Sequence, residues 1–390
     1  MKSICEVEGV EAAGIKEGKY GLALIKASGS AAAVFTKNLV MAEPVRLMKK
    51  TMEGRRLDGV IVNSGNANVF TGEQGYRDSE RMAEIAAEAL GTSPGYIGVA
   101  STGVIGRYLK MDLIEDQCAR IKDNLASDEK SGDDAAAAIM TTDLRPKHAI
   151  SKRDGFTVAG ITKGSGMIAP NMGTMLAFIY TDAEVPADDL EKALLTATER
   201  SFNRVVVDGD TSTNDCVFLT ATGCRGRQDY DEFYSALEEV CISLAKQIAE
   251  DGEGATKFVE VAVTGAESEE DAAEIAKTIV GSSLVKTAIY GEDPNWGRII
   301  AAAGRAGPEF DPLKTSISIG DGEKTVILEE KGVIKADDRI NPGALAEAKQ
   351  LMKGKKLRID FDLGTGIFHA TAWGCDLTDK YVEINGKYTT

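Results

Sequence analysis

The sequence predicts an α/β fold, and two kinds of segment support that prediction. Short apolar runs that suit strands recur along the whole chain. Longer segments lie between them, in which apolar residues return every three or four positions, as on one face of a helix. With 390 residues, of which 43% are hydrophobic, the chain can bury a sizeable core and form two domains or one elaborate domain.

The N-terminal half of the chain begins with strands. Residues 21–27, 31–36 and 58–65 ("GLALIKA", "AAAVFT" and "DGVIVNSG") are predicted strands, whereas residues 78–90 ("DSERMAEIAAEAL") have the spacing of a helix. Two later apolar runs are predicted to be further strands of the same core: residues 154–164 and 174–183.

The C-terminal half continues this mixture of elements. Three segments open with acidic residues, which suit the positive end of a helix dipole, and are predicted helices: residues 187–202, 231–250 and 269–282. Strands are predicted at residues 257–266, 356–364 and 367–377. No Pro/Ser-rich linker or block of charge separates these elements, so composition marks no domain boundary.

Composition argues against several classes of function. The net charge of −16 disfavours a nucleic-acid partner, because a phosphate backbone requires a basic surface. The two histidines, His148 and His369, leave little material for a histidine-based metal site or a Ser-His-Asp triad, so we expect no metal or other cofactor. No stretch approaches the roughly 20 apolar residues that span a bilayer, and the N-terminus has no secretory pattern. We therefore expect a cytoplasmic protein with no membrane partner, whose six cysteines are mostly buried, reduced thiols.

The segment Lys163–Phe178, "KGSGMIAPNMGTMLAF", joins a glycine-rich, proline-broken loop to an apolar run. Its glycines permit backbone angles that other residues avoid, and Pro170 fixes its own φ. The simplest interpretation is a loop that leads into a buried strand. A second hypothesis is that Gly173 lets the Thr174 hydroxyl turn back onto the preceding carbonyl, which is the geometry of self-cleavage.

Two other polar segments carry candidate chemistry. In "ASTGVIG", residues 100–106, the Thr102 hydroxyl stands beside the Gly103 amide, and two such donors can stabilise one developing oxyanion. The segment "VVVDGDTSTNDCVFL", residues 205–219, holds three aspartates. Counted from the first of them, the sixth and twelfth positions lack the glycine and the glutamate of a calcium loop, so no calcium site is predicted.

Five segments stand in a fixed order along the chain: "KGSGMIAPNMGTMLAF", "DGDTSTND", "DGEGATK", "YGEDPNWGRIIAAAGRAG" and the terminal "INGKYTT". Together they resemble the ornithine acetyltransferase family, also called glutamate N-acetyltransferase, and such long matches are far more specific than one glycine motif. The resemblance implies the mixed-sheet α/β fold of that ArgJ family. It also implies a chain that cleaves itself before a threonine, which then serves as the nucleophile.

On this resemblance, cleavage falls between Gly173 and Thr174, where the family usually has alanine before the threonine. It gives an α chain of residues 1–173 and a β chain of residues 174–390, a chemical boundary rather than a domain linker. The family moves an acetyl group from N2-acetylornithine to glutamate in arginine biosynthesis by a ping-pong reaction through acetyl-threonine. The α-amine of the new terminal threonine, with an ordinary pKa of about 7.7–8.0, would act as the base in place of histidine.

The resemblance further implies the roles of the site residues. Thr102 and Gly103 resemble the oxyanion hole, and the substrate-binding set is Thr141, Lys163, Thr174, Glu253, Asn385 and Thr390. Thr142 remains an alternative to Thr141. Among these residues, a lysine suits a substrate carboxylate and a glutamate suits substrate amino groups.

The family's assembly of two α and two β chains is also implied for this chain. The sequence does not decide whether acetyl-CoA is a second acetyl donor, because the family contains both ornithine-only and bifunctional members. Two other functions stay open from the residues. An autoprocessing aminopeptidase or amidase would pass the acyl group to water, and a non-catalytic metabolite-binding protein would need no cleavage.

Overall fold

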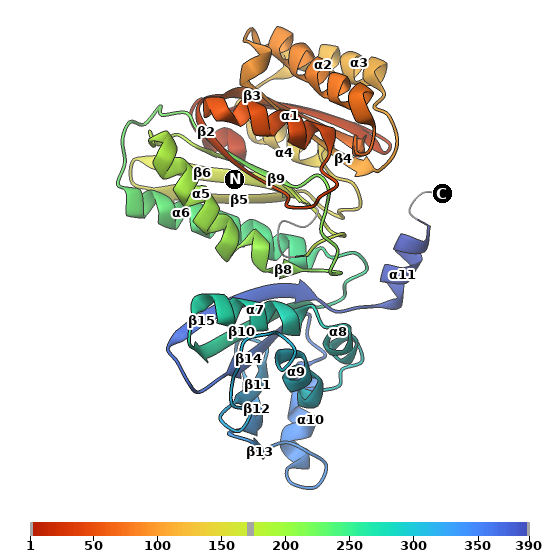
Figure 1. Cartoon of the computed structure of the whole chain (residues 1–390), viewed down its shortest axis with the longest axis vertical. Helices are drawn as coiled ribbons and strands as arrows, with labels where there is room; N and C mark the ends of the chain where they lie inside the picture. Colours follow the sequence, from red (N-terminus) through yellow and green to blue (C-terminus); the bar gives the residue numbers. More distant parts are fainter. Residues whose placement is uncertain (1–2, 170–174, 388–390) are drawn as a thin grey trace. The chain divides into compact units, whose positions relative to one another are not determined.

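The computed structural model describes residues 3–169 and 175–387, and these fold as two compact units (Figure 1). The first unit contains Met1–Asn203 and Asp210–Ile248, and the second contains Arg204–Gly209 and Ala249–Thr390. The chain therefore enters the second unit for six residues, returns to the first, and leaves it again. This interleaving explains why no linker composition marked the boundary.

The first unit is built on one mixed sheet of eight described strands. The sheet runs β4-β3-β2-β9-β7-β6-β5, with β1 paired to β2. The pairs β3–β4 and β7–β9 are parallel and the other pairs are antiparallel. The strands are β1 (Glu11–Glu17), β2 (Tyr20–Phe35), β3 (Arg56–Asn66), β4 (Ile97–Val104), β5 (Lys147–Arg153), β6 (Phe156–Lys163), β7 (Leu176–Thr181) and β9 (Cys216–Ala221).

The strand predictions at residues 21–27 and 31–36 are confirmed, and both runs belong to one continuous strand, β2. Its pairing with β3 shifts register between Lys26 and Gly29. A Cβ at Gly29 would lie 1.9 Å from the Ala221 carbonyl oxygen, so only glycine lets β9 approach there. Gly29, which lies between the two apolar runs, thus permits a close strand contact.

Helices cover both faces of this sheet. They are α1 (Glu43–Thr51), α2 (Gly72–Leu90), α3 (Met111–Ile121), α4 (Glu129–Ala138), α5 (Ala187–Arg200) and α6 (Tyr230–Glu250). Helices α1 and α2 pack against each other and against β4 (Figure 1). Phe178 of β7 lies in the buried core, with its ring centroid 5.8 Å from that of Phe218 of β9, whereas Ile179 lies beside Gly160 and Leu244 of α6 on the opposite face. This alternation follows from the two-residue period of a strand.

The second unit is built on a seven-stranded mixed sheet in the order β13-β12-β11-β14-β10-β15-β8. Its strands are β8 (Val205–Val206), β10 (Phe258–Ala266), β11 (Ser316–Gly320), β12 (Thr325–Glu330), β13 (Val333–Ile334), β14 (Lys356–Asp362) and β15 (Phe368–Cys375). Its helices are α7 (Glu269–Val280), α8 (Ser283–Tyr290), α9 (Trp296–Ala303), α10 (Pro342–Leu351) and α11 (Asp379–Gly386). The predicted α/β class with mixed sheets is therefore confirmed.

Two predictions about the chain as a whole can be compared with the structure. No helix in the described part of the chain is long and apolar enough to cross a membrane. All six cysteines are unpaired thiols, and five are buried, with Cys224 exposed. The expectation that most cysteines are buried is confirmed.

Candidate active site

One loop forms hydrogen bonds with the two strand ends that carry the predicted chemistry of the first unit. The loop "DTSTND", residues 210–215, precedes β9. The side-chain amide of Asn214 donates hydrogen bonds to the Ser101 carbonyl at 2.8 Å and to the Ala67 carbonyl at 2.6 Å. The next residue, Asp215, accepts a hydrogen bond from the Met175 N–H at 2.9 Å. The loop therefore fixes both the end of β4 and the start of β7.

Thr102 and Gly103 lie at the carboxyl end of β4, beside β3. Thr102 is buried, and Gly103 has φ +135 and pairs with Gly65. A Cβ at Gly103 would lie 2.3 Å from the Gly65 carbonyl carbon, which is backbone and cannot turn aside. Both the conformation and the space therefore require glycine at the position predicted to supply an oxyanion donor.

Lys163 ends β6 and is buried, with its ammonium in contact with Thr102. The Nζ of Lys163 donates to the Thr102 hydroxyl oxygen at 3.3 Å. The fold thus brings a predicted substrate ligand against a predicted oxyanion donor that lies on another strand. Met175, at the start of β7, is the described residue next to the predicted nucleophile.

Asp143 joins the Thr141 segment to the end of β6. Its carboxylate pairs with the Lys147 ammonium at 2.6 Å, with both side chains fully buried. It also accepts hydrogen bonds from the N–H groups of Gly164 at 2.6 Å and Thr141 at 3.0 Å. Burial alone would raise the pKa of Asp143, but the charges of Lys163 and Lys147 outweigh it and lower that pKa to about 2.

A third lysine adds positive charge to this cluster. Lys16 donates to the Ser64 hydroxyl at 2.8 Å and to the Met140 carbonyl at 2.5 Å. Partial burial, and then the positive charge of Lys163, lower the pKa of Lys16 to about 8. A site that gathers lysines in this way favours an anionic ligand such as a carboxylate.

The choice between Thr141 and Thr142 stays open. The Thr142 hydroxyl is 2.7 Å from the Ser165 hydroxyl and so already has a hydrogen-bond partner. Thr141 is tied to the cluster through its backbone N–H. Both threonines are partly exposed, so either hydroxyl can reach a ligand.

Asp215 is a functional candidate that was not predicted from the sequence, although its segment was tested as a calcium loop and is one of the motifs that resemble the family. It is fully buried, and burial raises the pKa of its carboxyl well above the usual range. The Met175 N–H, the Ser212 hydroxyl and the charge of Lys163 oppose this rise more weakly. Its second oxygen, Oδ2, has no hydrogen-bond partner among the described residues. The signals in the sequence are the motif "DGDTSTND" itself and its place directly before the apolar run "CVFL".

Two predicted substrate residues lie together in the second unit. The Asn385 amide of α11 donates to the Glu253 carboxylate at 2.8 Å. Helix α11 is held against the same loop, because the Thr378 hydroxyl donates to the Gly254 carbonyl at 2.7 Å. Helix α11 is thus docked on the loop at residues 253–254.

Three of the predicted site residues, Gly173, Thr174 and Thr390, lie outside the described residues. Within the described ranges, no group of three or more histidine, cysteine, aspartate or glutamate residues could hold a metal ion. The candidate residues described in the first unit carry hydroxyl, amide, ammonium and carboxyl groups.

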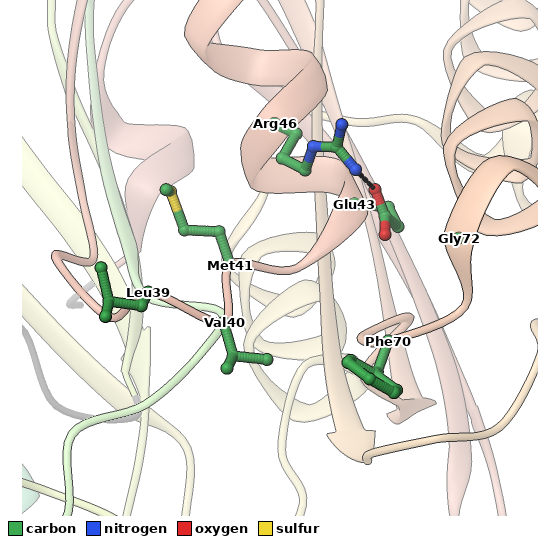
Figure 2. Close-up of a pocket in the computed structure, with 7 residues that line it drawn as sticks. All are labelled: Leu39, Val40, Met41, Glu43, Arg46, Phe70 and Gly72. Atoms are coloured by element: carbon green, nitrogen blue, oxygen red, sulfur yellow. Dashed lines mark hydrogen bonds and ion pairs between the residues drawn. The ribbon is translucent and has the colours of Figure 1, made fainter.

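A separate pocket of about 530 Å³ opens on the first unit beside α1 (Figure 2). Its lining residues are Leu39, Val40, Met41, Glu43, Arg46, Phe70 and Gly72. The charge of Arg46 is paired with Glu43 at 2.8 Å, and Leu39 and Phe70 expose large apolar surfaces. This mainly apolar lining suits a charged amino acid less well than the lysine cluster does.

The strand ends of this mixed α/β sheet bring together a buried threonine hydroxyl, a neighbouring amide at a position that requires glycine, and a lysine ammonium. Donors of these kinds can stabilise a developing oxyanion. The sequence profile of the ArgJ family matches residues 7–390. The chain belongs to the ArgJ family, as the resemblance of its motifs implied.

Proteins of related sequence span nearly the whole chain. The glutamate N-acetyltransferase of Methanosarcina mazei is 49% identical over 99% of this chain and 98% of its own length. The arginine biosynthesis bifunctional protein ArgJ of Archaeoglobus fulgidus is 45% identical over 99% of this chain and 100% of its own. A crystal structure of the bifunctional ArgJ protein of Bacillus halodurans is 43% identical, covering 53% of this chain and 96% of that chain, with a TM-score of 0.49.

Proposed function

We propose that this protein is an acyltransferase of arginine biosynthesis that moves the acetyl group of N2-acetylornithine to glutamate. The observation that carries the proposal is the contact between Lys163 and Thr102, which joins a cation for an amino-acid carboxylate to an oxyanion donor. Membership of the ArgJ family and relatives named glutamate N-acetyltransferase support it. The free thiols agree with a reducing compartment, so we propose that the enzyme acts in the cytoplasm.

The proposed reaction begins with self-cleavage between Gly173 and Thr174. The Thr174 hydroxyl attacks the Gly173 carbonyl, and water then releases the α chain, residues 1–173, from the β chain, residues 174–390. In turnover the same hydroxyl takes the acetyl group from N2-acetylornithine as an ester and passes it to the glutamate amine. The amides and hydroxyl at Thr102–Gly103 stabilise the oxyanion in each acyl-transfer step.

We further propose that two α and two β chains assemble, and that Thr141, Glu253, Asn385 and Thr390 complete the substrate site. Native mass measurement that gives about twice the chain mass of 41.4 kDa, unchanged by reductant, is expected. Relatives carry both the monofunctional and the bifunctional name, so the use of acetyl-CoA is a question for assay. Release of free CoA in the presence of glutamate would establish it as a second donor.

The first prediction tests cleavage directly. Purified protein should give two fragments on denaturing electrophoresis, and N-terminal sequencing of the larger one should begin Thr-Met-Leu-Ala. Thr174→Ala should remain intact and inactive, because the hydroxyl serves in both processing and transfer, whereas Thr174→Ser should retain part of both activities.

Two results would contradict this proposal. An active preparation that contains only the intact chain would exclude cleavage as the source of the nucleophile. Release of acetate from N2-acetylornithine at the same rate with and without glutamate, with no acetylglutamate formed, would favour the amidase alternative instead.

A further inference from the structure

The proposed reaction gives no role to Lys16, although this residue lies in a row of paired residues that leads to Thr102. Lys16 of β1 faces Gly21 of β2, and Gly21 faces Ser64 of β3. Ser64 in turn faces Thr102 of β4. A Cβ at Gly21 would lie 2.9 Å from Cδ of Lys16 and 2.8 Å from the Ser64 hydroxyl oxygen, so the missing side chain leaves the lysine room to cross β2. Lys16 therefore reaches from β1 to the strand beside Thr102.

Two uncharged groups hold the Lys16 ammonium in this position. It donates hydrogen bonds to the Ser64 hydroxyl at 2.8 Å and to the Met140 carbonyl at 2.5 Å. Met140 directly precedes Thr141, a candidate substrate ligand. Within the described ranges, Lys16 forms no ion pair with a carboxylate. An ammonium group has a further N–H beyond these two bonds, and the side chain is exposed, so a ligand can reach it.

The charges around Lys16 favour an anion at this position. Partial burial, and then the positive charge of Lys163 of β6, lower the pKa of Lys16 to about 8, whereas Asp143 opposes this effect more weakly. A carboxylate ligand would offset the repulsion between the two lysines. Other charged groups on β1 and on the elements packed against it have partners of their own: Glu11 with Lys26, Glu17 with Arg120, Asp134 with Lys130, and Asp133 with His148.

The two substrates of the proposed reaction differ in their carboxylates. N2-acetylornithine has a single carboxylate, whereas glutamate has another at the end of its side chain. Lys163 already serves the carboxylate that both substrates share. We propose that Lys16 binds the side-chain carboxylate of glutamate, so that it selects the acetyl acceptor and not the donor. This inference rests on the proposed function and assigns a specificity residue to it.

The positions of the two lysines suit this division. The Lys163 ammonium contacts the Thr102 hydroxyl at 3.3 Å, and Lys16 contacts the hydroxyl of Ser64, which faces Thr102 on the adjacent strand. Neighbouring strands lie about 4.8 Å apart, so both ammonium groups border one small site. Glutamate, whose carboxylates are joined by a short carbon chain, can contact both. The side-chain ammonium of N2-acetylornithine has the same charge as Lys16 and gains nothing from it.

Lys16→Met tests the assignment through the choice of acceptor. The variant keeps an apolar stem but carries no charge. Glutamine is the matched acceptor, because its side chain has nearly the shape of glutamate but is neutral. We expect the KM for glutamate to rise roughly tenfold, and the preference for glutamate over glutamine to fall, because one hydrogen bond between charged groups is lost. The KM for N2-acetylornithine should not rise.

Lys26→Met is the matched control. Lys26 lies on the neighbouring strand β2, but its ammonium already pairs with Glu11 at 3.2 Å. Its loss should leave the KM values for both substrates and the preference for glutamate unchanged. Intact mass after cleavage before Thr174 reports whether each variant has folded.

The pH dependence provides a readout that a structural role would not move. Lys16 is charged below its pKa of about 8 and neutral above it, so the wild-type KM for glutamate should rise as the pH increases through about 8. In Lys16→Arg this rise should be absent, because a guanidinium stays protonated up to about pH 12. Other groups that titrate in this range are common to both enzymes, so the difference reports on residue 16. This comparison remains available if Lys16→Met fails to fold.

The outcomes are distinct from those that test the proposed function. Four results would each overturn the role of Lys16 while leaving the proposed reaction intact: an unchanged KM for glutamate in Lys16→Met, an equal rise in the KM for N2-acetylornithine, an equal effect of Lys26→Met, or parallel pH profiles for the wild type and Lys16→Arg. If the wild type transfers no acetyl group from N2-acetylornithine to glutamate, the proposed function itself fails and this inference fails with it.

Discussion

The ion pair between Asp143 and Lys147 shows how single residues stabilise the candidate site. Both side chains are fully buried, and the same carboxylate accepts the N–H groups of Thr141 and Gly164. A buried charge that loses its partner is strongly destabilising, because burial prevents water from replacing that partner. Asp143 therefore fixes the strand end that carries Lys163. The Asp143–Lys147 ion pair thus maintains the geometry of the candidate site.

Removing the Lys147 ammonium is therefore expected to destabilise the first unit. Lys147→Met should lower the free energy of unfolding by about 3–5 kcal/mol, measured by urea denaturation. The chain offers a matched control in Lys130 and Asp134, also four residues apart but with side chains 82% and 42% exposed. Lys130→Met should change stability by only about 0.5 kcal/mol. Equal effects of the two variants would show that burial of the Asp143–Lys147 pair does not matter.

At the scale of elements, the end of β4 depends on a position that only glycine can occupy. Gly103→Ala would place a Cβ 2.3 Å from the Gly65 carbonyl carbon of β3 and would strain a backbone at φ +135. The strand end must then move, and the donors at Thr102–Gly103 with it. We expect turnover to fall by about 10²–10³, the typical loss when one oxyanion donor is removed.

Gly106 provides the control for this variant. It lies three residues further along the chain at φ +74, also in the region that favours glycine, but a Cβ there would meet nothing within 4 Å. Gly106→Ala should therefore cost about 1–2 kcal/mol of stability and leave turnover close to that of the wild type. A similar loss of turnover in both variants would mean that backbone strain, rather than the collision with β3, is responsible.

Several elements could be predicted from local pattern, and others could not. Helices α2, α5, α6 and α7 were predicted because their apolar spacing persists over several turns. The short helix α11 was not predicted, because "DKYVEING" contains too few apolar positions to show a period, and its position depends on contacts with the loop at Gly254.

The residues of the candidate site likewise include some that could be predicted from the sequence and others that could not. Lys163 and Thr102 were predicted because each lies within a short contiguous motif that can be recognised in the sequence. Asn214 and Asp215 act through contacts with Ser101, 113 residues away, and Met175, 40 residues away. No pattern within a single stretch of sequence contains such information, so their roles emerge only when the strands are assembled.

At the scale of the whole molecule, the predicted cleavage point lies within the first unit and not between the units. Strands β6 and β7, on either side of residues 173 and 174, pair along their length from Val158–Thr181 to Lys163–Leu176. Their buried side chains lie in one core, and apolar burial contributes about 25 cal/mol per Å². Since all six cysteines are free thiols, noncovalent contacts alone should hold the two fragments together.

The last prediction concerns the C-terminal segment of the second unit. Deleting Lys387–Thr390 leaves α11 and the bond between Asn385 and Glu253 in place, so it removes Thr390 without removing its support. If Thr390 binds substrate through a hydrogen bond to a charged group, worth about 1.5–3 kcal/mol, the KM for N2-acetylornithine should rise roughly tenfold or more. Cleavage before Thr174 should proceed normally, because the strands around it belong to the first unit.

Val382→Ala, a change to an exposed side chain of α11, is the control and should leave KM unchanged. An unaltered KM in the truncated enzyme would remove Thr390 from the site, whereas loss of cleavage would show that the last residues act in folding, since no substrate is needed for that step.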